Sequence, residues 1–174
     1  RVSFPLNIIE ASPASPSCIL KRSNIEIWTF PLFHRIACNG YVFRELSSNI
    51  RLNKDRLHEY RLTPIQIKAV KRGEAIEHNG NMIPAAVFIL EPLPPVCYAY
   101  CSDTRYDQRL LPFIQGVSVL YHETTFMNEL EEMADHTGHS TAGQAGLMAA
   151  EAGVSCLITG HYSSRYKDVR PLIA

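Results

Sequence analysis

Acidic and histidine side chains stand at the ends of several predicted strands or just before a predicted helix. These side chains are Asp103, His122, Glu123, His139 and His161. In α/β folds, polar groups that follow neighbouring strands meet at one edge of the sheet, where binding sites form. Carboxylates and neutral imidazoles bind zinc, and they also serve as general acids and bases. The pattern therefore predicts one site for metal or acid–base chemistry.

Each member of this set, taken alone, also fits a structural role. Asp103 with Thr104 could form a turn or a helix cap, and His139 could support the helix that follows it. His136 and His139 have ligand-like spacing, but a glycine separates them, which disfavours a zinc pair formed by these two alone. The order of the whole set is more specific than any one member.

The elements that carry these residues change in kind along the chain. Strands are predicted at 4–9, 18–21, 25–30, 41–43, 96–101, 117–121 and 155–159. Helices are predicted near 107–115, 125–134 and 141–152, with a last helix that begins near Ser164. Thr141 and Gln144 have the spacing of a capping box. Strands first and alternating strands and helices later predict an α/β sandwich.

Length and composition narrow the classes of protein that fit. The 174 residues suffice for one compact domain, and 46% apolar against 20% charged residues predicts a folded core. Basic and acidic residues balance at 17 each, which excludes a polycation that coats nucleic acid through its overall charge. No apolar run approaches the ~20 residues of a membrane-spanning helix, and no signal peptide is recognisable.

The five cysteines are an odd number without a compact framework, which disfavours a disulfide-stapled secreted domain. Most lie in apolar runs and are expected to be reduced, buried and structural in a cytosolic protein. Cys97 and Cys101 share one face of a predicted strand, so core packing is favoured over metal binding there.

A basic segment interrupts the neutral chain. Residues 50–72 carry seven basic and two acidic side chains, a net charge of +5. Such a segment can be a solvated helix face, or it can contact phosphates, in which case affinity falls steeply with salt. Glycine and proline residues between 73 and 95 predict a loop-rich connection to the later strands.

Four sequence blocks, in their order and spacing, closely resemble motifs of the ribonuclease Z family. This family comprises the tRNA 3′-processing endonucleases of the metallo-β-lactamase superfamily. These blocks are YCSDT at 100–104, HETTF at 122–126, HST at 139–141 and HYSSRY at 161–166. A fifth block, FPLFHR at 30–35 with GYVFRE at 40–45, resembles the family segment that carries another metal-binding histidine. The resemblance covers nearly the whole chain. It implies a metallo-β-lactamase αββα sandwich in which residues 1–174 are the C-terminal part of one domain, with a basic insert at about 50–73.

The resemblance also implies roles for individual residues. His34, Asp103 and His161 are expected to bind two zinc ions, with Asp103 as the bridge. Two ions roughly 3.5–4 Å apart stabilise the attacking and leaving oxygens of a phosphodiester, and a bridging carboxylate suits that spacing. His139 is the expected general acid, oriented by Glu123. The residues expected at the RNA are Lys68, Lys71, Arg72 and Arg165, the last of which could instead pair with a carboxylate.

Two departures separate this sequence from the family pattern. No two histidines are separated by one residue, so the His-x-His-x-Asp-His block is absent and is expected before Arg1. Asp135 and His136 only superficially resemble the end of that block. Three protein ligands remain for two metals. The segment at 62–73 keeps a proline, its basic residues and a glycine but lacks the family's Gly-Pro pair. Apolar sequence at both ends fits a piece of something larger.

Three hypotheses follow for function. The first is a zinc-dependent endoribonuclease that removes the 3′ trailer from precursor tRNA, cytoplasmic, homodimeric and without a membrane segment. The second keeps the fold but makes the protein a phosphodiesterase or esterase for small substrates. The third is a non-catalytic half-domain for RNA binding or dimerisation, which the absent histidine block favours.

Overall fold

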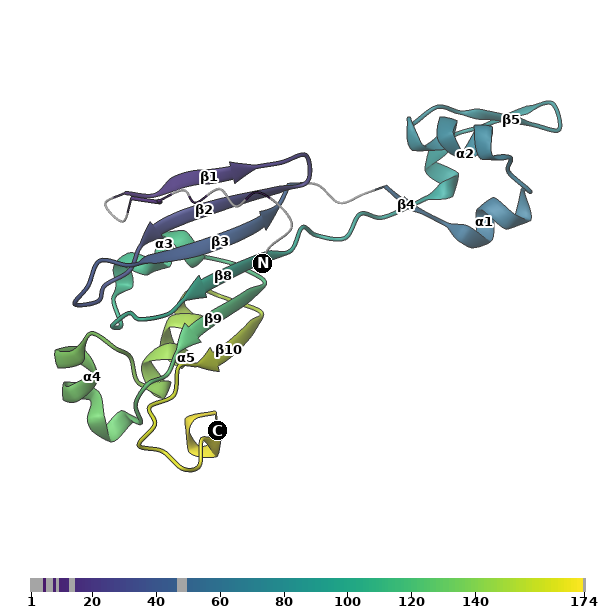
Figure 1. Cartoon of the computed structure of the whole chain (residues 1–174). Helices are drawn as coiled ribbons and strands as arrows, with labels where there is room; N and C mark the ends of the chain where they lie inside the picture. Colours follow the sequence, from purple (N-terminus) through teal and green to yellow (C-terminus); the bar gives the residue numbers. More distant parts are fainter. Residues whose placement is uncertain (1–4, 6–7, 9, 13–14, 47–49, 174) are drawn as a thin grey trace. The chain divides into compact units, whose positions relative to one another are not determined.

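The computed structural model describes residues 5, 8, 10–12, 15–46 and 50–173. The chain divides into two compact units. The large unit comprises residues 1–46 and 96–174, and the small unit comprises residues 47–95 (Figure 1). The strand predicted at 4–9 lies mostly outside the described residues.

A mixed sheet forms the centre of the large unit. In the described part of that unit the sheet has six strands, in the order β1-β2-β3-β8-β9-β10. Their bounds are β1 Ser17–Lys21, β2 Ile25–Pro31, β3 Asn39–Glu45, β8 Cys97–Cys101, β9 Val119–Glu123 and β10 Cys156–Gly160. The pairs from β1 to β8 are antiparallel, whereas β8, β9 and β10 run parallel. The carboxyl ends of these last three strands therefore lie at the same edge of the sheet.

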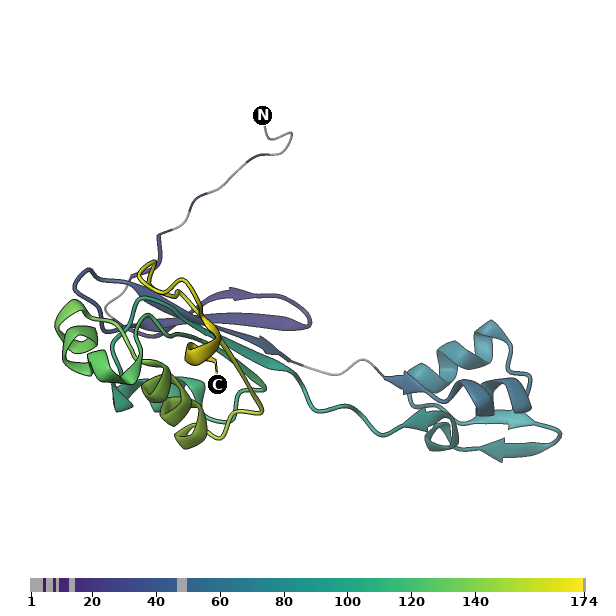
Figure 2. The same ribbon diagram turned by 90° about the horizontal axis from the view of Figure 1, so that it is seen from below.

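Helices cover one face of this sheet (Figure 2). They are α3 Leu111–Ile114, α4 Glu131–Thr137 and α5 Ala142–Glu151, with 3₁₀ turns at Gln108–Leu110, Asn128–Leu130 and Arg170–Leu172. The predicted capping box starts α5, since Thr141 Oγ1 accepts from Gln144 N at 3.2 Å and Gln144 Oε1 accepts from Thr141 N at 3.0 Å. Among the described residues, no helix is long and apolar enough to cross a bilayer.

The helix predicted from Ser164 is wrong. Only the 3₁₀ turn at Arg170–Leu172 forms in that stretch. Asp168 Oδ1 accepts from Arg170 N at 3.0 Å, which satisfies the backbone locally instead of through a helix. Pro171 also lacks the N–H that a continued helix needs.

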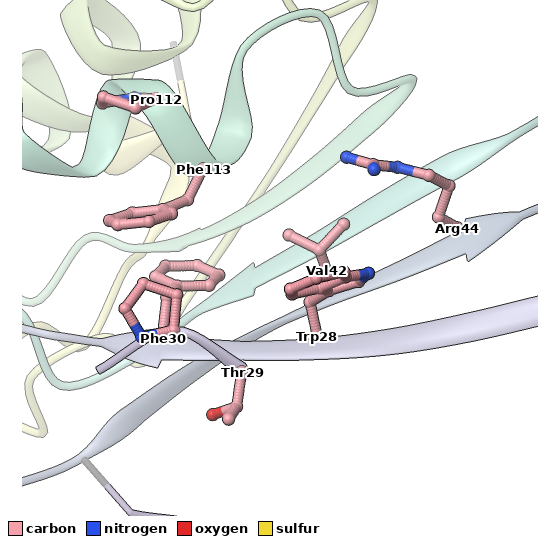
Figure 3. Close-up of a pocket in the computed structure, with 8 residues that line it drawn as sticks. Trp28, Thr29, Phe30, Val42, Arg44, Pro112 and Phe113 are labelled. Atoms are coloured by element: carbon pink, nitrogen blue, oxygen red, sulfur yellow. The ribbon is translucent and has the colours of Figure 1, made fainter. Parts of the chain in front are cut away.

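The core lies between the sheet and its helices. Val42, Ala99 and Leu120 lie in register across three adjacent strands and are buried with Ile114 of α3 and Met148 of α5. Beside this core, a pocket of about 260 Å³ lies beneath Pro112 and the ring of Phe113 (Figure 3). Its other lining residues are Pro16, Trp28, Thr29, Phe30, Val42 and Arg44, none of which is a predicted site residue.

The opposite face of the sheet is aromatic. Tyr41, Tyr100 and Tyr121 lie in register, and the last two stack with ring centroids 4.8 Å apart. Phe43 and Tyr98 form a neighbouring pair at 5.8 Å. A sheet that is apolar on both faces is typical of one covered on both sides. The pattern fits the sequence-based expectation of a four-layer sandwich.

The prediction of buried cysteines is wrong for two of the five. Cys18 and Cys156 are exposed, because they lie in β1 and β10, the edge strands of the described sheet. Cys101 is fully buried, and burial raises the pKa of its thiol to about 12.

The small unit has a core of its own. Its elements are β4 Arg51–Leu52, α1 Lys54–Glu59, α2 Pro64–Lys71, β5 Ile76–His78, β6 Asn81–Ile83, β7 Ile89–Leu90 and a 3₁₀ turn at Ala85–Phe88. Val70, Ile76, Ala85 and Phe88 are buried together. Residues expected to be a loop-rich connection thus pack as a hairpin and a turn against α2. The unit as a whole carries seven basic and five acidic side chains, a net charge of +2 instead of the +5 of residues 50–72 alone.

Candidate metal and acid–base site

The ends of the parallel strands hold two site residues in a strained backbone. Asp103 follows β8 and His161 follows β10, with φ of 58° and 59°. Residues other than glycine with this left-handed conformation cost about 1–2 kcal/mol, and such strain concentrates at functional sites. Aspartate and histidine tolerate it better than most residues. Both side chains are thereby turned from the strand direction toward one cluster.

Four of the predicted residues meet in that cluster. One ligand atom from each of Asp103, Glu123, His139 and His161 lies within 4.8 Å of the others. His161 Nε2 is 3.0 Å from Asp103 Oδ1, and these side chains are 39% and 46% exposed. Glu123 is fully buried and the His139 side chain is only 15% exposed. The cluster therefore has an exposed half and a buried half.

The carboxylate of Glu123 is the centre of the buried half. Its Oε1 accepts from Thr104 N at 2.7 Å and from His139 Nδ1 at 2.9 Å. Its Oε2 accepts from Ser140 N at 3.1 Å and from Thr125 Oγ1 at 2.5 Å. An ionised carboxylate is acceptor-only and offers about four lone-pair positions, which matches these four donors. Glu123 is thus fixed in place with its charge satisfied, although no solvent reaches it.

The ring of His139 lies next to two other imidazoles. Its centroid is 4.8 Å from that of His34 and 5.3 Å from that of His161. Because Glu123 accepts the proton on Nδ1, Nε2 is the nitrogen that can exchange a proton with a bound molecule. This is the contact that a general acid oriented by a carboxylate requires.

His34 lies outside the four-residue group but beside it. Its Nδ1 is 2.7 Å from Gly138 O, and a carbonyl only accepts, so the Nε2 of a neutral His34 keeps its lone pair. Gly138 has φ of 79°, and a Cβ there would lie 2.9 Å from His34 Nδ1. Glycine is therefore required for this approach.

His122 does not join the cluster. Successive side chains of a strand face opposite sides, so His122 and its neighbour Glu123 cannot share one site. The His122 ring is fully buried, its Nδ1 lies 2.8 Å from Glu123 O, and its Nε2 has no partner among the described residues. Burial lowers the pKa of His122, which keeps the ring neutral.

Several residues of the site were missed by the sequence analysis. They are Cys38, Thr104, Thr125 and Ser140. The Cys38 thiol donates to Asp103 O at 3.2 Å, and burial, followed by the charges of Asp103 and Glu123, raises its pKa. The polar residues adjoin a predicted site residue in sequence, which is the signal that could have found them. Nothing local in the sequence indicates Cys38.

The expected RNA contacts of the small unit differ in their partners. Lys68 and Lys71 are exposed on α2, and no acidic side chain among the described residues forms an ion pair with either. Arg72 instead makes a bidentate pair with Glu74, with Nε–Oε1 and Nη2–Oε2 distances of 2.6 and 2.8 Å. The charge of Arg72 is therefore largely matched.

Arg165 belongs to the large unit and lies near the cluster. Its guanidinium is over the Phe126 ring, 4.8 Å from the centroid, and that ring in turn meets His139 edge-on at 6.2 Å. Arg165 also contacts Ser163 Oγ at 3.1 Å and Met133 Sδ at 3.3 Å. It pairs with no carboxylate among the described residues, so the alternative of a carboxylate partner is not observed.

The donor set fits zinc on the exposed half of the cluster. Zinc binds imidazole nitrogen and carboxylate oxygen, which His161 and Asp103 offer side by side. Glu123 and His139 are already engaged with each other. The arrangement therefore suits metal binding on the exposed side and proton transfer on the buried side.

Curated proteins named ribonuclease Z match this chain along nearly its whole length. The protein from Cytophaga hutchinsonii is 40% identical over 174 residues, 99% of this chain and 55% of its own length. Those from Parabacteroides distasonis and Porphyromonas gingivalis strain W83 are each 36% identical, over 95% and 99% of this chain and 54% and 57% of their own length. The chain thus spans about half the length of the curated relatives it matches. No protein-family model matches the chain.

Solved structures agree on the fold. Human tRNase Z, short form, superposes with a TM-score of 0.55 at 17% identity, over 88% of this chain and 42% of that one. A metallo-β-lactamase fold protein from Bacillus subtilis gives 0.55 at 18% identity, over 95% of this chain and 46% of that one. The predicted fold class is confirmed.

Proposed function

We propose that the protein to which this chain belongs matures the 3′ ends of tRNA. The similarity of the chain to ribonuclease Z proteins and its metallo-β-lactamase fold support this proposal. The complete protein would be a zinc-dependent endoribonuclease that cuts precursor tRNA after the discriminator nucleotide. The tRNA keeps a 3′-hydroxyl and the trailer leaves with a 5′-phosphate. The proposal includes two zinc ions, a homodimer and a cytoplasmic location, as the resemblance implies.

The observation that supports the proposal most strongly is the hydrogen bond between Glu123 and His139 beside the Asp103–His161 pair. Zinc, when bound, supplies Lewis-acid stabilisation of charge on the phosphate and on the attacking and leaving oxygens. His34, Asp103 and His161 would hold it, as the resemblance implies. These three ligands are too few for two ions, so a second ion would need further ligands.

His139 is the proposed general acid. Scission of the phosphodiester leaves a strongly basic 3′ oxygen, and a positioned donor accelerates such a step by on the order of 10²–10⁴-fold. When both ring nitrogens are protonated, His139 Nε2 can deliver its proton to the leaving oxygen and become neutral, while Glu123 accepts from Nδ1 and prevents the ring from turning. Arg165 would neutralise a phosphate near His139, and the position of its guanidinium over the Phe126 ring, which meets His139 edge-on, supports this role.

Cleavage of a trailer-bearing precursor tRNA by the complete protein tests the proposal. Activity that is lost on chelation and restored by zinc is expected, with products that end in a 3′-hydroxyl and a 5′-phosphate. A His139→Ala variant that cleaves at the wild-type rate would show that His139 is not the general acid.

A small diester is the second candidate substrate. One observation favours it: the acidic residues of the small unit reduce its net charge to +2, which weakens the argument for a phosphate-binding surface. Comparable turnover of a small phosphodiester and of precursor tRNA would support that reading over the first.

A further inference from the structure

We propose that Thr125 is a positioning residue that fixes His161 with its proton on Nδ1. His161 Nε2, the nitrogen beside Asp103, is then the one left to face a cation. This inference rests on the proposed function and deepens it, because it concerns how this chain fixes the tautomer of a proposed metal ligand. It rests on hydrogen bonds that exist in the chain itself.

Histidine tautomers elsewhere in the large unit are decided by unambiguous acceptors. The Nδ1 atoms of His34, His122 and His139 lie 2.7, 2.8 and 2.9 Å from Gly138 O, Glu123 O and Glu123 Oε1. Carbonyl and carboxylate oxygens only accept, so each of these rings carries a proton on Nδ1.

His161 differs because its Nδ1 faces a hydroxyl. The distance to Thr125 Oγ1 is 2.9 Å. A hydroxyl both donates and accepts, so this contact alone leaves the tautomer of His161 undecided. The answer depends on where the single proton of Thr125 points.

Glu123 decides the direction of that proton. Thr125 Oγ1 has two acceptors in reach, Glu123 Oε2 at 2.5 Å and His161 O at 3.1 Å. The carboxylate bond is shorter and is charge-assisted, and such bonds are roughly twice as strong as neutral ones. The proton therefore points to Glu123, and a lone pair of Oγ1 is left to accept from His161 Nδ1.

The consequence lies on the exposed side of the ring. If the Thr125 proton pointed to His161 Nδ1 instead, the proton of a neutral His161 would be on Nε2. Nε2 would then donate to Asp103, and the two proposed metal ligands would be hydrogen-bonded to each other. Because the Thr125 proton points to Glu123, the His161 proton is on Nδ1, and the lone pair of Nε2 is free to bind a cation together with Asp103. Partners that fix the other ring nitrogen in this way change metal affinity by about 10–100-fold. One carboxylate thus orients both His139 directly and His161 through Thr125.

The neighbouring threonine gives a matched control. Thr124 is also buried, but its Oγ1 donates to Gly160 O at 3.2 Å and, among the described residues, bonds to no histidine. Replacement by valine keeps the shape of either residue and removes the hydroxyl. Replacement of Thr125 by serine keeps the hydroxyl and removes a methyl group.

The test combines two measurements on the complete protein and its Thr125→Val, Thr125→Ser and Thr124→Val variants. Nitrogen-15 NMR of the histidine rings without zinc reports which nitrogen of His161 carries the slowly exchanging proton. Competition with a chromophoric chelator reports the zinc dissociation constant. We expect a protected Nδ1 proton on His161 in the wild type, Thr125→Ser and Thr124→Val, and its loss in Thr125→Val.

The zinc dissociation constant should rise about 10–100-fold in Thr125→Val and stay within about threefold in the other two variants. A protected Nδ1 proton in Thr125→Val, or a Thr125→Ser variant as defective as Thr125→Val, overturns the assignment. If the proton responds as expected but no variant, nor the wild type, binds zinc, the assignment of Thr125 stands and the proposed function fails.

Discussion

The two units of the chain place their charged groups in opposite ways. In the large unit, Glu123 is fully buried and four donors surround it. In the small unit, Lys68 and Lys71, the proposed RNA contacts, are exposed, and the core of that unit has four buried apolar residues. A buried charge needs every partner, because an unpaired one is costly. Exposed charges act nearly independently, and salt screens them.

Substitutions in the two units should therefore have different effects. Removal of one group from the buried network should disable chemistry outright. Loss of exposed charge should weaken contact with a polyanion gradually and leave chemistry unchanged.

Replacement of His139, the proposed general acid, should have a large effect on the rate. We expect His139→Ala to slow cleavage of precursor tRNA by on the order of 10²–10⁴-fold, because the leaving oxygen then departs unprotonated. The measurement is the single-turnover rate. His136→Ala is the control, since His136 is exposed on α4 only three residues away and should cleave normally. A normal rate in both variants would contradict the assignment.

Loss of the core of the small unit should be nearly as severe, but for stability. Phe88 is fully buried there, and Phe88→Ala should cost about 3–5 kcal/mol in the free energy of unfolding of that unit. Hydrogen exchange should show faster exchange within residues 50–95 and unchanged protection in β8, β9 and β10. Equal loss of protection in both units would show that they do not fold separately.

Charge reversal on α2 should weaken RNA binding and its response to salt. Lys68→Glu with Lys71→Glu removes two cations without ion-pair partners among the described residues. The slope of log affinity against log salt should fall by about 0.7–0.9 for each lost phosphate contact. Arg72→Ala should change affinity less, because Glu74 already pairs with Arg72. A larger effect at Arg72 than at the two lysines would reverse this ranking.

The smallest expected effect is on stability against pH. Burial lowers the pKa of His122 in the folded state from its usual 6.5. Below that pH the unfolded chain takes up a proton that the folded chain does not. Stability is therefore lost as pH falls through 6.5, by up to about 1.4 kcal/mol per unit for one proton. In denaturant titrations between pH 7 and 5, His122→Gln should show a shallower loss, and an unchanged slope would contradict it.

The sequence indicated the fold and the main site residues because their signals are local. Polar residues at the ends of apolar strands were enough to bring Asp103, Glu123 and His161 together, since three parallel strands end at one edge. His139 followed from its place before a capped helix.

What the sequence did not indicate depends on contacts between distant segments. Cys38 reaches Asp103 across 65 positions, and His34 reaches Gly138 across 104. The left-handed backbone of Asp103 and His161 was not indicated either, because aspartate and histidine tolerate this conformation but adopt it only where the surrounding structure requires it. The helix predicted after Ser164 does not form because local turns override helix propensity. Cys18 and Cys156 are exposed because their strands lie at the edges of the sheet.

The most direct test of the division between the units compares two substrates in one protein. Asp103→Ala and the pair Lys68→Glu with Lys71→Glu are assayed in the complete protein, on precursor tRNA and on a small phosphodiester. We predict that Asp103→Ala abolishes both activities, whereas the lysine pair impairs only the tRNA reaction. Equal impairment of both substrates by the lysine changes, or small-diester turnover that survives Asp103→Ala, would contradict the account.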